Sequence, residues 1–314
     1  LLTMGVRVEP VEGKRDLHTF VKLPWRIYAD DPHWIPPLIG DTKKLFDREK
    51  NPFFEHGDIR LFLARRDDRV VGRIAAIRNR AHEEFHEEPV GFFGFFECEE
   101  DREAAEALFD AVRGYLRSEG LGVMRGPMNP STNEDCGLLV DGFDTPPLVM
   151  MPHGRRYYPE LLEACGFTGV KDLYAFLLTA ESIPDNLLRG AKLARRKNPD
   201  VEIRPLDKSR FREEVEAFRE VYTAAWERNW GFIPMTDREI DHMAEQLKPV
   251  MEPGLIRVAR HEGRPIGFAL GLPELIQALK HANGKLFPVG LLKILWHARR
   301  LNRARILVLG LVKE

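Results

Sequence analysis

Two stretches of the chain share one pattern of apolar and polar positions. Residues 62–77, FLARRDDRVVGRIAAI, have the alternation of a strand, a short polar turn and a second strand. Residues 257–272, RVARHEGRPIGFALGL, repeat it at an offset of 195, because Ala64 corresponds to Ala259 and Gly72 to Gly267. The same offset places 6–11 on 201–206. A solenoid repeats every 20–50 residues or so, and this repeat is far longer, so the pattern predicts two copies of one domain.

The rest of the first half alternates between helical and strand spacing. Apolar intervals predict a helix within 13–30, interrupted near Pro24, and a helix at 101–119 with an Asp cap and a Gly stop. Residues 90–97 are aromatic on both faces, which is typical of a buried strand. The remaining elements predicted here are a strand from Val123, a helix within 157–167 and a closing strand at 172–178.

The second half predicts the same kinds of element in a similar order. They are a basic helix at 187–197, a strand at 201, helices at 211–227 and 236–250, the repeated hairpin and a terminal strand from Ala304. We therefore expect an α/β fold with mixed sheets and tandem duplicated domains at 1–182 and 183–314. Because the last strand pattern runs to the final residue, we interpret the second domain as truncated at its central strand.

Composition narrows the functional classes. The 314 residues carry 47 basic and 49 acidic side chains, the balance of an ordinary globular chain. The three cysteines form no CxxC pair, and no leader or membrane-spanning run is present, so we expect a cytoplasmic protein. A basic cluster at 189–197 lies in a chain of net charge −2 without a recognised binding motif, so we expect no nucleic-acid partner.

A polar loop follows the strand that begins at Val123. Residues 129–137, NPSTNEDCG, concentrate short hydrogen-bonding side chains where a ligand would meet the end of a strand. In this interpretation Glu134 and Asp135 are candidate general bases, and the orienting groups are Asn129, Ser131 and Asn133. The alternative is a network of turns and caps, because these side chains also bond their own backbone.

The order of elements resembles the GNAT N-acyltransferase superfamily, and the duplication resembles its tandem-domain members. The order is strand, two helices, hairpin, central strand, helix, strand, a helix ending in Gly-Phe, and strand. The resemblance implies transfer of an acyl group from acyl-CoA or acyl carrier protein to a small-molecule amine without a metal. The apolar residues within 273–303 would shelter a long acyl chain, so we expect long-chain donors to be preferred. In that fold, a Gly-rich turn after the central strand holds the pyrophosphate of the donor.

The resemblance implies different roles for the two copies. After the first central strand, residues 99–105 contain no glycine and four carboxylates, which repel phosphate, and the family's Tyr-x-x-x-Gly-Phe element has Leu162 in place of Tyr. The first copy is therefore expected to be degenerate, with Tyr158, or its neighbour Tyr157, as the candidate acid. In the second copy the donor-binding candidates are Leu309, Gly310, Leu311 and Val312, and the acceptor-facing candidates are Trp226, Asn229 and Trp230. A catalytically inactive GNAT-like binding module is the alternative function.

A metal-binding pattern appears once. Residues 82–86, HEEFH, match HExxH, which on a helix places two histidines one turn apart for zinc. Pro89 follows closely and no third ligand is evident, so we favour an exposed acidic connection without a helix or metal.

Residues 273–303 have no counterpart in the first copy. They carry six basic side chains against one acidic side chain, a net charge of +5, interleaved with apolar residues such as Leu292 and Trp296. This composition predicts a basic amphipathic helix that contacts an anionic membrane peripherally, and the alternative is a helix whose apolar stripe packs on the core.

Overall fold

The structure, a computed structural model, describes residues 5–312 and divides into two compact units. Unit 1 contains the chain up to Thr168, with Gly231–Glu239 and Glu274–Asn302. Unit 2 contains Gly169–Trp230, Ile240–Pro273 and the residues from Arg303 onward. Residues 274–302 thus belong to the first compact unit although they follow the second hairpin, and the predicted domain limits at 182 and 183 stay a proposal.

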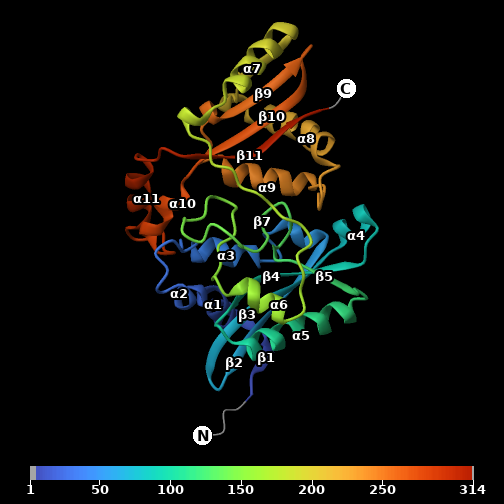
Figure 1. The fold of residues 1–314 in the computed structure, drawn as a ribbon, viewed down its shortest axis with the longest axis vertical. Coiled ribbons are helices and arrows are strands. Elements are labelled where there is room, and N and C mark those ends of the chain that lie inside the picture. The colour runs from blue at the N-terminus through green and yellow to red at the C-terminus, as the bar shows by residue number, and fades with distance from the viewer. Residues whose placement is uncertain (1–4, 313–314) are drawn as a thin grey trace. The chain divides into compact units, whose positions relative to one another are not determined.

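Unit 1 is built on a five-stranded sheet in the order β1-β2-β3-β4-β5 (Figure 1). The first four strands are antiparallel, whereas β4 and β5 are parallel. The long helix α5 packs on β2 and β3 through a fully buried stripe that includes Leu108, Phe109 and Val112. The strands are β1 (Arg7–Pro10), β2 (Gly57–Arg66), β3 (Arg69–Asn79), β4 (Val90–Cys98) and β5 (Val123–Arg125).

The helices within 13–30, 101–119 and 157–167 follow the predicted apolar spacing, whereas the helices at 39–45 and 80–86 were not predicted. The side chain of Asp101 caps α5 by accepting from the backbone N–H of Ala104, and Pro24 separates α1 from α2 as expected. A two-stranded sheet, β6 (Met128–Asn129) with β7 (Asp135–Cys136), frames the polar loop. The helices are α1 (Gly13–Lys22), α2 (Pro24–Ile27), α3 (Ile39–Leu45), α4 (Arg80–His86), α5 (Arg102–Ser118) and α6 (Tyr158–Ala164), with the 3-10 turn η1 (Pro52–Glu55).

Three further helical elements of unit 1 lie within residues 274–302. They are α10 (Ile276–Leu279), the 3-10 turn η5 (Lys280–Ala282) and α11 (Gly290–Ala298).

Unit 2 contains a four-stranded sheet in the order β11-β10-β9-β8 (Figure 1). The sheet is antiparallel throughout, and α8 packs on β10 and β11. The strands are β8 (Val201–Pro205), β9 (Ile256–His261), β10 (Arg264–Pro273) and β11 (Ala304–Leu311). The helices are α7 (Asp185–Lys197), α8 (Phe211–Trp226) and α9 (Asp237–Leu247), whose first three residues belong to unit 1. The 3-10 turns are η2 (Ala180–Ser182), η3 (Lys208–Arg210) and η4 (Pro253–Leu255).

The duplication predicted from the sequence extends to individual residue pairs. Val8 pairs with Ala64 in unit 1, and Ile203 pairs with Ala259 in unit 2, each shifted by 195. In both hairpins a bulge interrupts the register at the same place, beside Gly72 and its counterpart. A one-residue slip would turn every side chain to the other face, so this agreement confirms the repeated β-strand and hairpin architecture.

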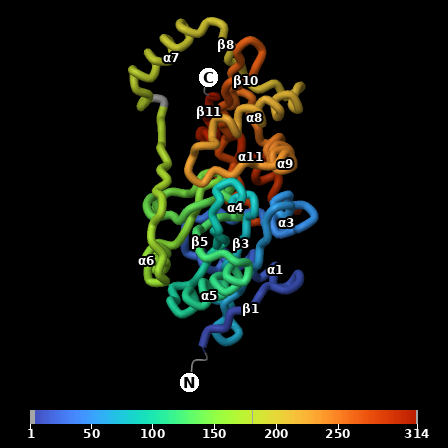
Figure 2. Tube along the Cα trace, turned by 90° about the vertical axis from the view of Figure 1, so that its right-hand side faces the viewer, coloured from blue at the N-terminus to red at the C-terminus, as the bar shows by residue number. Residues whose placement is uncertain are grey.

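One predicted strand is absent. Residues 172–178 were expected to close the first copy, yet they form an extended segment that pairs with no strand of the described chain and leads into α7 (Figure 2). Apolar side chains on both of its faces are exposed, including Tyr174 at 78% and Phe176 at 86%. The prediction was wrong because strand propensity becomes a strand only where a partner supplies hydrogen bonds.

Substitution of Gly94 tests how closely β6 packs against β4 in unit 1. A Cβ at this position would lie 1.6 Å from the carbonyl oxygen of Met128, so Gly94→Ala should push β6 away from β4 and lower the free energy of unfolding by about 1–3 kcal/mol. Gly114→Ala is the control, because Gly114 lies in α5 with open space around it and alanine favours a helix by about 0.5–1 kcal/mol. Urea unfolding measures both, and equal midpoints for the two variants would contradict the packing.

Candidate functional site

The outer edge of β4 in unit 1 is closed by side chains of the same unit. The N–H of Glu99 donates to the carbonyl of Val71 on β3, so its neighbour Cys98 directs its backbone groups away from β3. There, the N–H of Cys98 donates to Tyr158 Oη at 3.1 Å, and its carbonyl accepts from Tyr157 Oη at 2.7 Å. These backbone groups are therefore not available to a bound ligand.

Asn129 and Gly94 close the same edge further along. Asn129 Oδ1 accepts from the N–H of Phe95 at 2.6 Å, where the backbone of Phe95 has a positive φ of 50° at the bulge in β4. Gly94 lets the carbonyl of Met128 approach to a distance that any side chain would block. Two of the predicted site residues, Asn129 and Tyr158, thus serve as partners of the central strand.

A buried polar cluster lies on β4 beside this edge. Glu97 Oε2 accepts from Tyr28 Oη and from Tyr158 Oη, each at 2.7 Å, and Arg73 lies 3.7 Å from the other carboxylate oxygen. Burial raises the pKa of Glu97, although Arg73 and the two tyrosines oppose that rise, and burial raises the pKa of Tyr158 well above its ordinary value. Sequence reasoning missed Glu97, Tyr28 and Arg73; the available signal was one carboxylate inside an aromatic strand.

The polar loop is held by bonds within unit 1. Ser131 Oγ donates to Glu134 Oε2 at 2.6 Å, and the N–H of Asn133 donates to Ser131 Oγ at 3.1 Å. Asn133 Nδ2 also donates to the carbonyl of Ile233 at 3.2 Å, and Asp135 lies in β7. The structure brings Ser131, Asn133, Glu134 and Asp135 together, with the bonding expected of a turn network. Their catalytic roles stay predictions.

Glu134 nevertheless has the proton affinity of a general base. Burial raises its pKa to about 7, and the nearby carboxylates of Glu239 and Asp135 add to the rise against the hydrogen bonds from Ser131. Glu239 in turn lies 2.8 Å from His56 Nε2, and His56 Nδ1 lies 3.2 Å from Asn79 Oδ1. A carboxylate that titrates near neutral pH can accept a proton from a substrate amine.

The corresponding edge in unit 2 is arranged differently. Leu311 pairs with Gly267 as Cys98 pairs with Gly72, so Leu311 is the register counterpart of Cys98. The N–H of Val312 donates to Ile266 on β10, which directs the backbone groups of Leu309 and Leu311 to the other side. Within residues 5–312, β11 pairs only with β10, and the side chains of Leu309 and Leu311 are 69% and 65% exposed.

Gly310 occupies the position in unit 2 that Glu97 occupies in unit 1. Gly310 pairs with Phe268 as Glu97 pairs with Arg73, and a Cβ on Gly310 would lie 2.3 Å from the ring of Trp226. The structure therefore brings together two predicted site residues, Trp226 from α8 and Gly310 from β11. Asn229 donates its N–H to the carbonyl of Trp226 at 2.8 Å, and Trp230 is 42% exposed.

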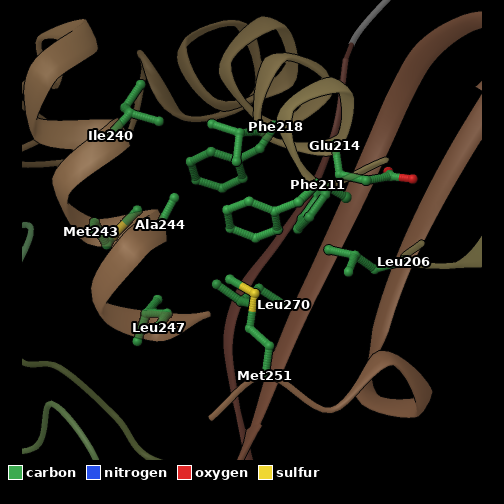
Figure 3. A pocket seen from close by; sticks show the side chains of 12 residues that line it. Leu206, Phe211, Glu214, Phe218, Ile240, Met243, Ala244, Leu247, Met251 and Leu270 are labelled. Carbon is green, nitrogen blue, oxygen red and sulfur yellow. The ribbon is translucent and has the colours of Figure 1, made fainter. Parts of the chain in front are cut away.

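An apolar pocket lies between α8, α9 and β10 of unit 2 (Figure 3). It has a cavity of about 30 Å³ and is lined by aromatic and thioether side chains, with Phe211 and Phe218 facing Met243 and Ala244 across it. The one charged lining residue, Glu214, is paired with Arg204 at 2.7 Å. Methionine side chains adapt their shape, so such a pocket can take the end of a hydrocarbon chain.

A polar cavity of about 420 Å³ opens in unit 1 beside Tyr157. Its arginines are paired with acids, Arg155 with Asp30 at 2.7 Å and Arg156 with Asp144. Paired charges of this kind leave little attraction for a diphosphate.

The HExxH segment is helical, which corrects the expected irregular connection. Residues 82–86 lie in α4, where His82 is buried and the rings of His82 and His86 are 4.5 Å apart. Burial and the neighbouring His86 lower the pKa of His82 to about 4, and His86 Nε2 lies 2.7 Å from the carbonyl of Phe232. Among residues 5–312 no cluster of three or more potential metal ligands occurs.

Comparisons with known proteins give two relatives that match most of the chain. A bacterial ceramide synthase of Caulobacter vibrioides (strain NA1000 / CB15N) is 37% identical over 311 residues, which cover 98% of this chain and 80% of that protein. Protein YghO of Escherichia coli (strain K12) is 34% identical over 304 residues, 96% of this chain and 77% of that protein. No family model matches the sequence.

Among solved structures, a tandem GNAT protein from the clavulanic acid biosynthesis pathway aligns with 85% of this chain and 74% of its own. The TM-score is 0.42 and the sequence identity is 11%. The fold class predicted from the sequence, a mixed α/β protein with tandem GNAT-like domains, agrees with the strand order and duplicated register of the two sheets.

The pKa of Glu134 predicts how stability depends on pH. It is about 7 in the folded chain against an ordinary value of 4.5, so between these values the folded state binds more protons than the unfolded state. The free energy of unfolding should therefore fall as the pH rises through this window. Glu134→Gln removes the titration while keeping an acceptor for Ser131, so its urea midpoint should fall less than that of the wild type between about pH 5 and pH 8.

The control for this measurement is Glu163→Gln, which alters an exposed carboxylate on α6 and should keep the wild-type slope. Identical slopes for Glu134→Gln and the wild type would show that Glu134 does not titrate in this window.

Proposed function

The chain belongs to the family of the Caulobacter bacterial ceramide synthase and Escherichia coli YghO, and on that premise we propose that this acyltransferase acylates a long-chain amine. A ceramide is the amide of a fatty acid and a long-chain amino alcohol. The proposed donor is acyl-CoA or acyl carrier protein. The amine attacks the thioester carbonyl, the C–N bond forms, the C–S bond breaks, and the leaving thiolate takes up a proton.

One observation carries this proposal: the 37% identity with the ceramide synthase extends over 98% of the chain. The match therefore includes both sheets, the polar loop and residues 273–303, so a shared reaction class is its simplest explanation. The acyl chain length and the amine acceptor are proposals of this section.

We propose that the thioester donor binds along the edge of β11 in unit 2 that pairs with no strand among residues 5–312. The pantetheine arm of such a donor carries amide groups that can pair with a strand, and the outward backbone groups of Leu309 and Leu311 offer both a donor and an acceptor. Gly310 between them has no side chain, and the ring of Trp226 packs against it where Glu97 places its carboxylate in unit 1. The same edge of β4 is occupied by Asn129, Tyr157 and Tyr158, which supports the interpretation of the first copy as degenerate.

For the hydrocarbon part, we propose the pocket between α8 and α9, with Trp226, Asn229 and Trp230 as acceptor-contacting residues at the end of α8. The pocket lining is apolar except for Glu214, and burying each CH₂ group contributes about 0.8 kcal/mol. With the cleft in the second copy, Glu134 and Asp135 are structural residues of unit 1, and their role as the base belongs to the alternative of a cleft in the first copy. The burial of Tyr158 makes it a weaker candidate acid than the sequence indicated.

We also propose a cytoplasmic protein that touches an anionic membrane through residues 273–303, where a lipid acceptor would be encountered. Among residues 5–312, no helix combines the length and apolarity that crossing a bilayer requires.

The test of the function is an assay of the purified chain and of the longest natural form of the protein. Acyl-CoA donors of increasing chain length are mixed with a long-chain amino alcohol or with a short primary amine, and thiol release and the N-acyl product are measured. We expect turnover with the long-chain amine only. Thiol release without amide product would indicate hydrolysis of the thioester and contradict transfer to an amine. No turnover with any donor would favour the catalytically inactive binding module.

Leu311→Pro tests the donor edge of β11. Proline removes only the outward N–H of Leu311, because the β10-facing bonds come from its neighbours. Loss of one hydrogen bond should raise the KM for the donor roughly fivefold to tenfold and leave the KM for the amine unchanged. Leu311→Ala keeps the N–H and is the matched control. Equal donor KM values for the two variants would remove β11 as the donor-binding edge.

Two opposite changes test the pocket of unit 2. Ala244→Leu fills the cavity and should shift the preferred chain length of the substrate downward, whereas Met243→Ala enlarges it and should shift the preference upward. Both variants lose some stability, about 1–3 kcal/mol, so unfolding is measured alongside turnover. Shifts in the same direction for both variants would count against the pocket as the hydrocarbon site.

A further inference from the structure

Helix α11 of unit 1 is apolar on the face that it turns outward. Leu292 is 66% exposed, Leu295 55% and Trp296 53%, and these residues lie on one side of the helix by their spacing. The turn before the helix adds Phe287 at 75% and Val289 at 52%. We call these five residues, with Leu291, the α11 surface. The sequence left open whether this apolar stripe packs on the core, and the exposures show that it does not.

The opposite face of α11 is anchored within unit 1. Gly290 lies so close to the carbonyl oxygen of Lys285 that a Cβ would be 1.9 Å from it, and His297 stacks on His281 of η5 with ring centroids 3.4 Å apart. The end of η5 is fixed in turn by Trp25, whose Nε1 donates to Asn283 Oδ1 at 2.9 Å. One face of the helix is therefore anchored to unit 1, and the α11 surface lies on the opposite, exposed face.

The charges around the α11 surface are almost all positive. Residues 273–303 contain six lysines and arginines and the single acid Glu274, which is buried, for a net charge of +5. Lys293 and Arg299 are exposed within or at the end of α11, and the guanidinium of Arg300 lies 4.3 Å from the centre of the Trp296 ring. A helix that is apolar outward, basic around its rim and rich in aromatic residues matches the boundary between lipid headgroups and acyl chains.

We propose that the α11 surface is a docking site for an anionic lipid bilayer. The apolar side chains enter the acyl boundary while Lys293, Arg299 and Arg300 contact headgroup phosphates, so that the helix lies in the plane of the interface. Charge complementarity selects this occupant, because residues 273–303 offer six cations and no exposed carboxylate. Binding does not depend on acyl transfer and is measured without substrates.

The experiment is sedimentation of the whole chain with vesicles of phosphatidylcholine containing phosphatidylglycerol, compared with phosphatidylcholine alone. We expect pelleting with the anionic vesicles that falls at least tenfold in the variant Leu292→Glu/Trp296→Glu and in the variant Lys293→Glu/Arg299→Glu/Arg300→Glu. These side chains are exposed, so the fold should persist, and far-ultraviolet circular dichroism checks it. Pelleting should also weaken as salt rises.

The matched control is Leu173→Glu/Leu177→Glu, which alters two apolar side chains of unit 2 that are 60% and 80% exposed. It should pellet like the wild type. If this control lost as much pelleting as the α11 variants, the binding would be nonspecific adsorption of exposed apolar side chains, and the proposal would be overturned. Equal pelleting of the wild type and both α11 variants, or none by any, would also overturn it. Size-exclusion chromatography without lipid tests the alternative that a second copy of the chain covers the α11 surface. A dimer that dissociates in the variant Leu292→Glu/Trp296→Glu would identify the surface as a protein interface and overturn the proposal.

A failure of the vesicle experiment is distinguishable from a failure of the proposed function. The turnover assay uses detergent-dispersed amine, in which the α11 variants should react like the wild type. Loss of turnover there, with vesicle binding intact, concerns only the acyltransferase proposal.

Discussion

The hydrogen bonding of the outward backbone groups on the central strand governs what each unit can do. In β4 the N–H and carbonyl of Cys98 and the N–H of Phe95 are satisfied by Tyr158, Tyr157 and Asn129. A buried strand cannot leave such groups without partners, because each costs roughly the free energy of a lost hydrogen bond. In the first copy, side chains from the polar loop and from α6 therefore occupy the hydrogen-bonding groups at the edge of the sheet.

The two copies share a register and differ at one pair of positions. Glu97 in unit 1 is a buried carboxylate that needs Tyr28, Tyr158 and Arg73 as partners, whereas its counterpart in unit 2 is Gly310 beneath the ring of Trp226. A buried charge keeps its partners fixed, because removing one of them leaves an uncompensated carboxylate. A glycine imposes no such demand, and in the described part of the chain the backbone groups of Leu309 and Leu311 beside it have no side-chain partner of the kind that Tyr157 and Tyr158 provide in unit 1. The proposed donor edge in the second copy rests on this contrast.

Exposed apolar groups at α11 and in residues 172–178 have different physical origins. Helix α11 keeps its shape without covering its outer face, because Gly290 and His297 anchor the inner one. Residues 172–178 have the pattern of a central strand and lie extended without a partner in the described chain. The α11 surface combines an ordered helical face with basic side chains at Lys293, Arg299 and Arg300, which is the arrangement that suits a lipid interface.

The sequence by itself determined the duplication, the hairpins, the cap of α5 and the mixed α/β class, because these features depend on spacing of two or 3.6 residues and on local turn chemistry. It did not determine that 172–178 would remain unpaired or that HExxH would form a helix, since both depend on which neighbours supply contacts. The candidate site shows the same division. The polar loop was found from its composition, but its bonds to Phe95 and to residues 231–233 join segments about 34 to 100 residues apart. Only the tertiary structure brings such segments together, and it alone placed a buried Glu97 on one central strand and an exposed edge on the other.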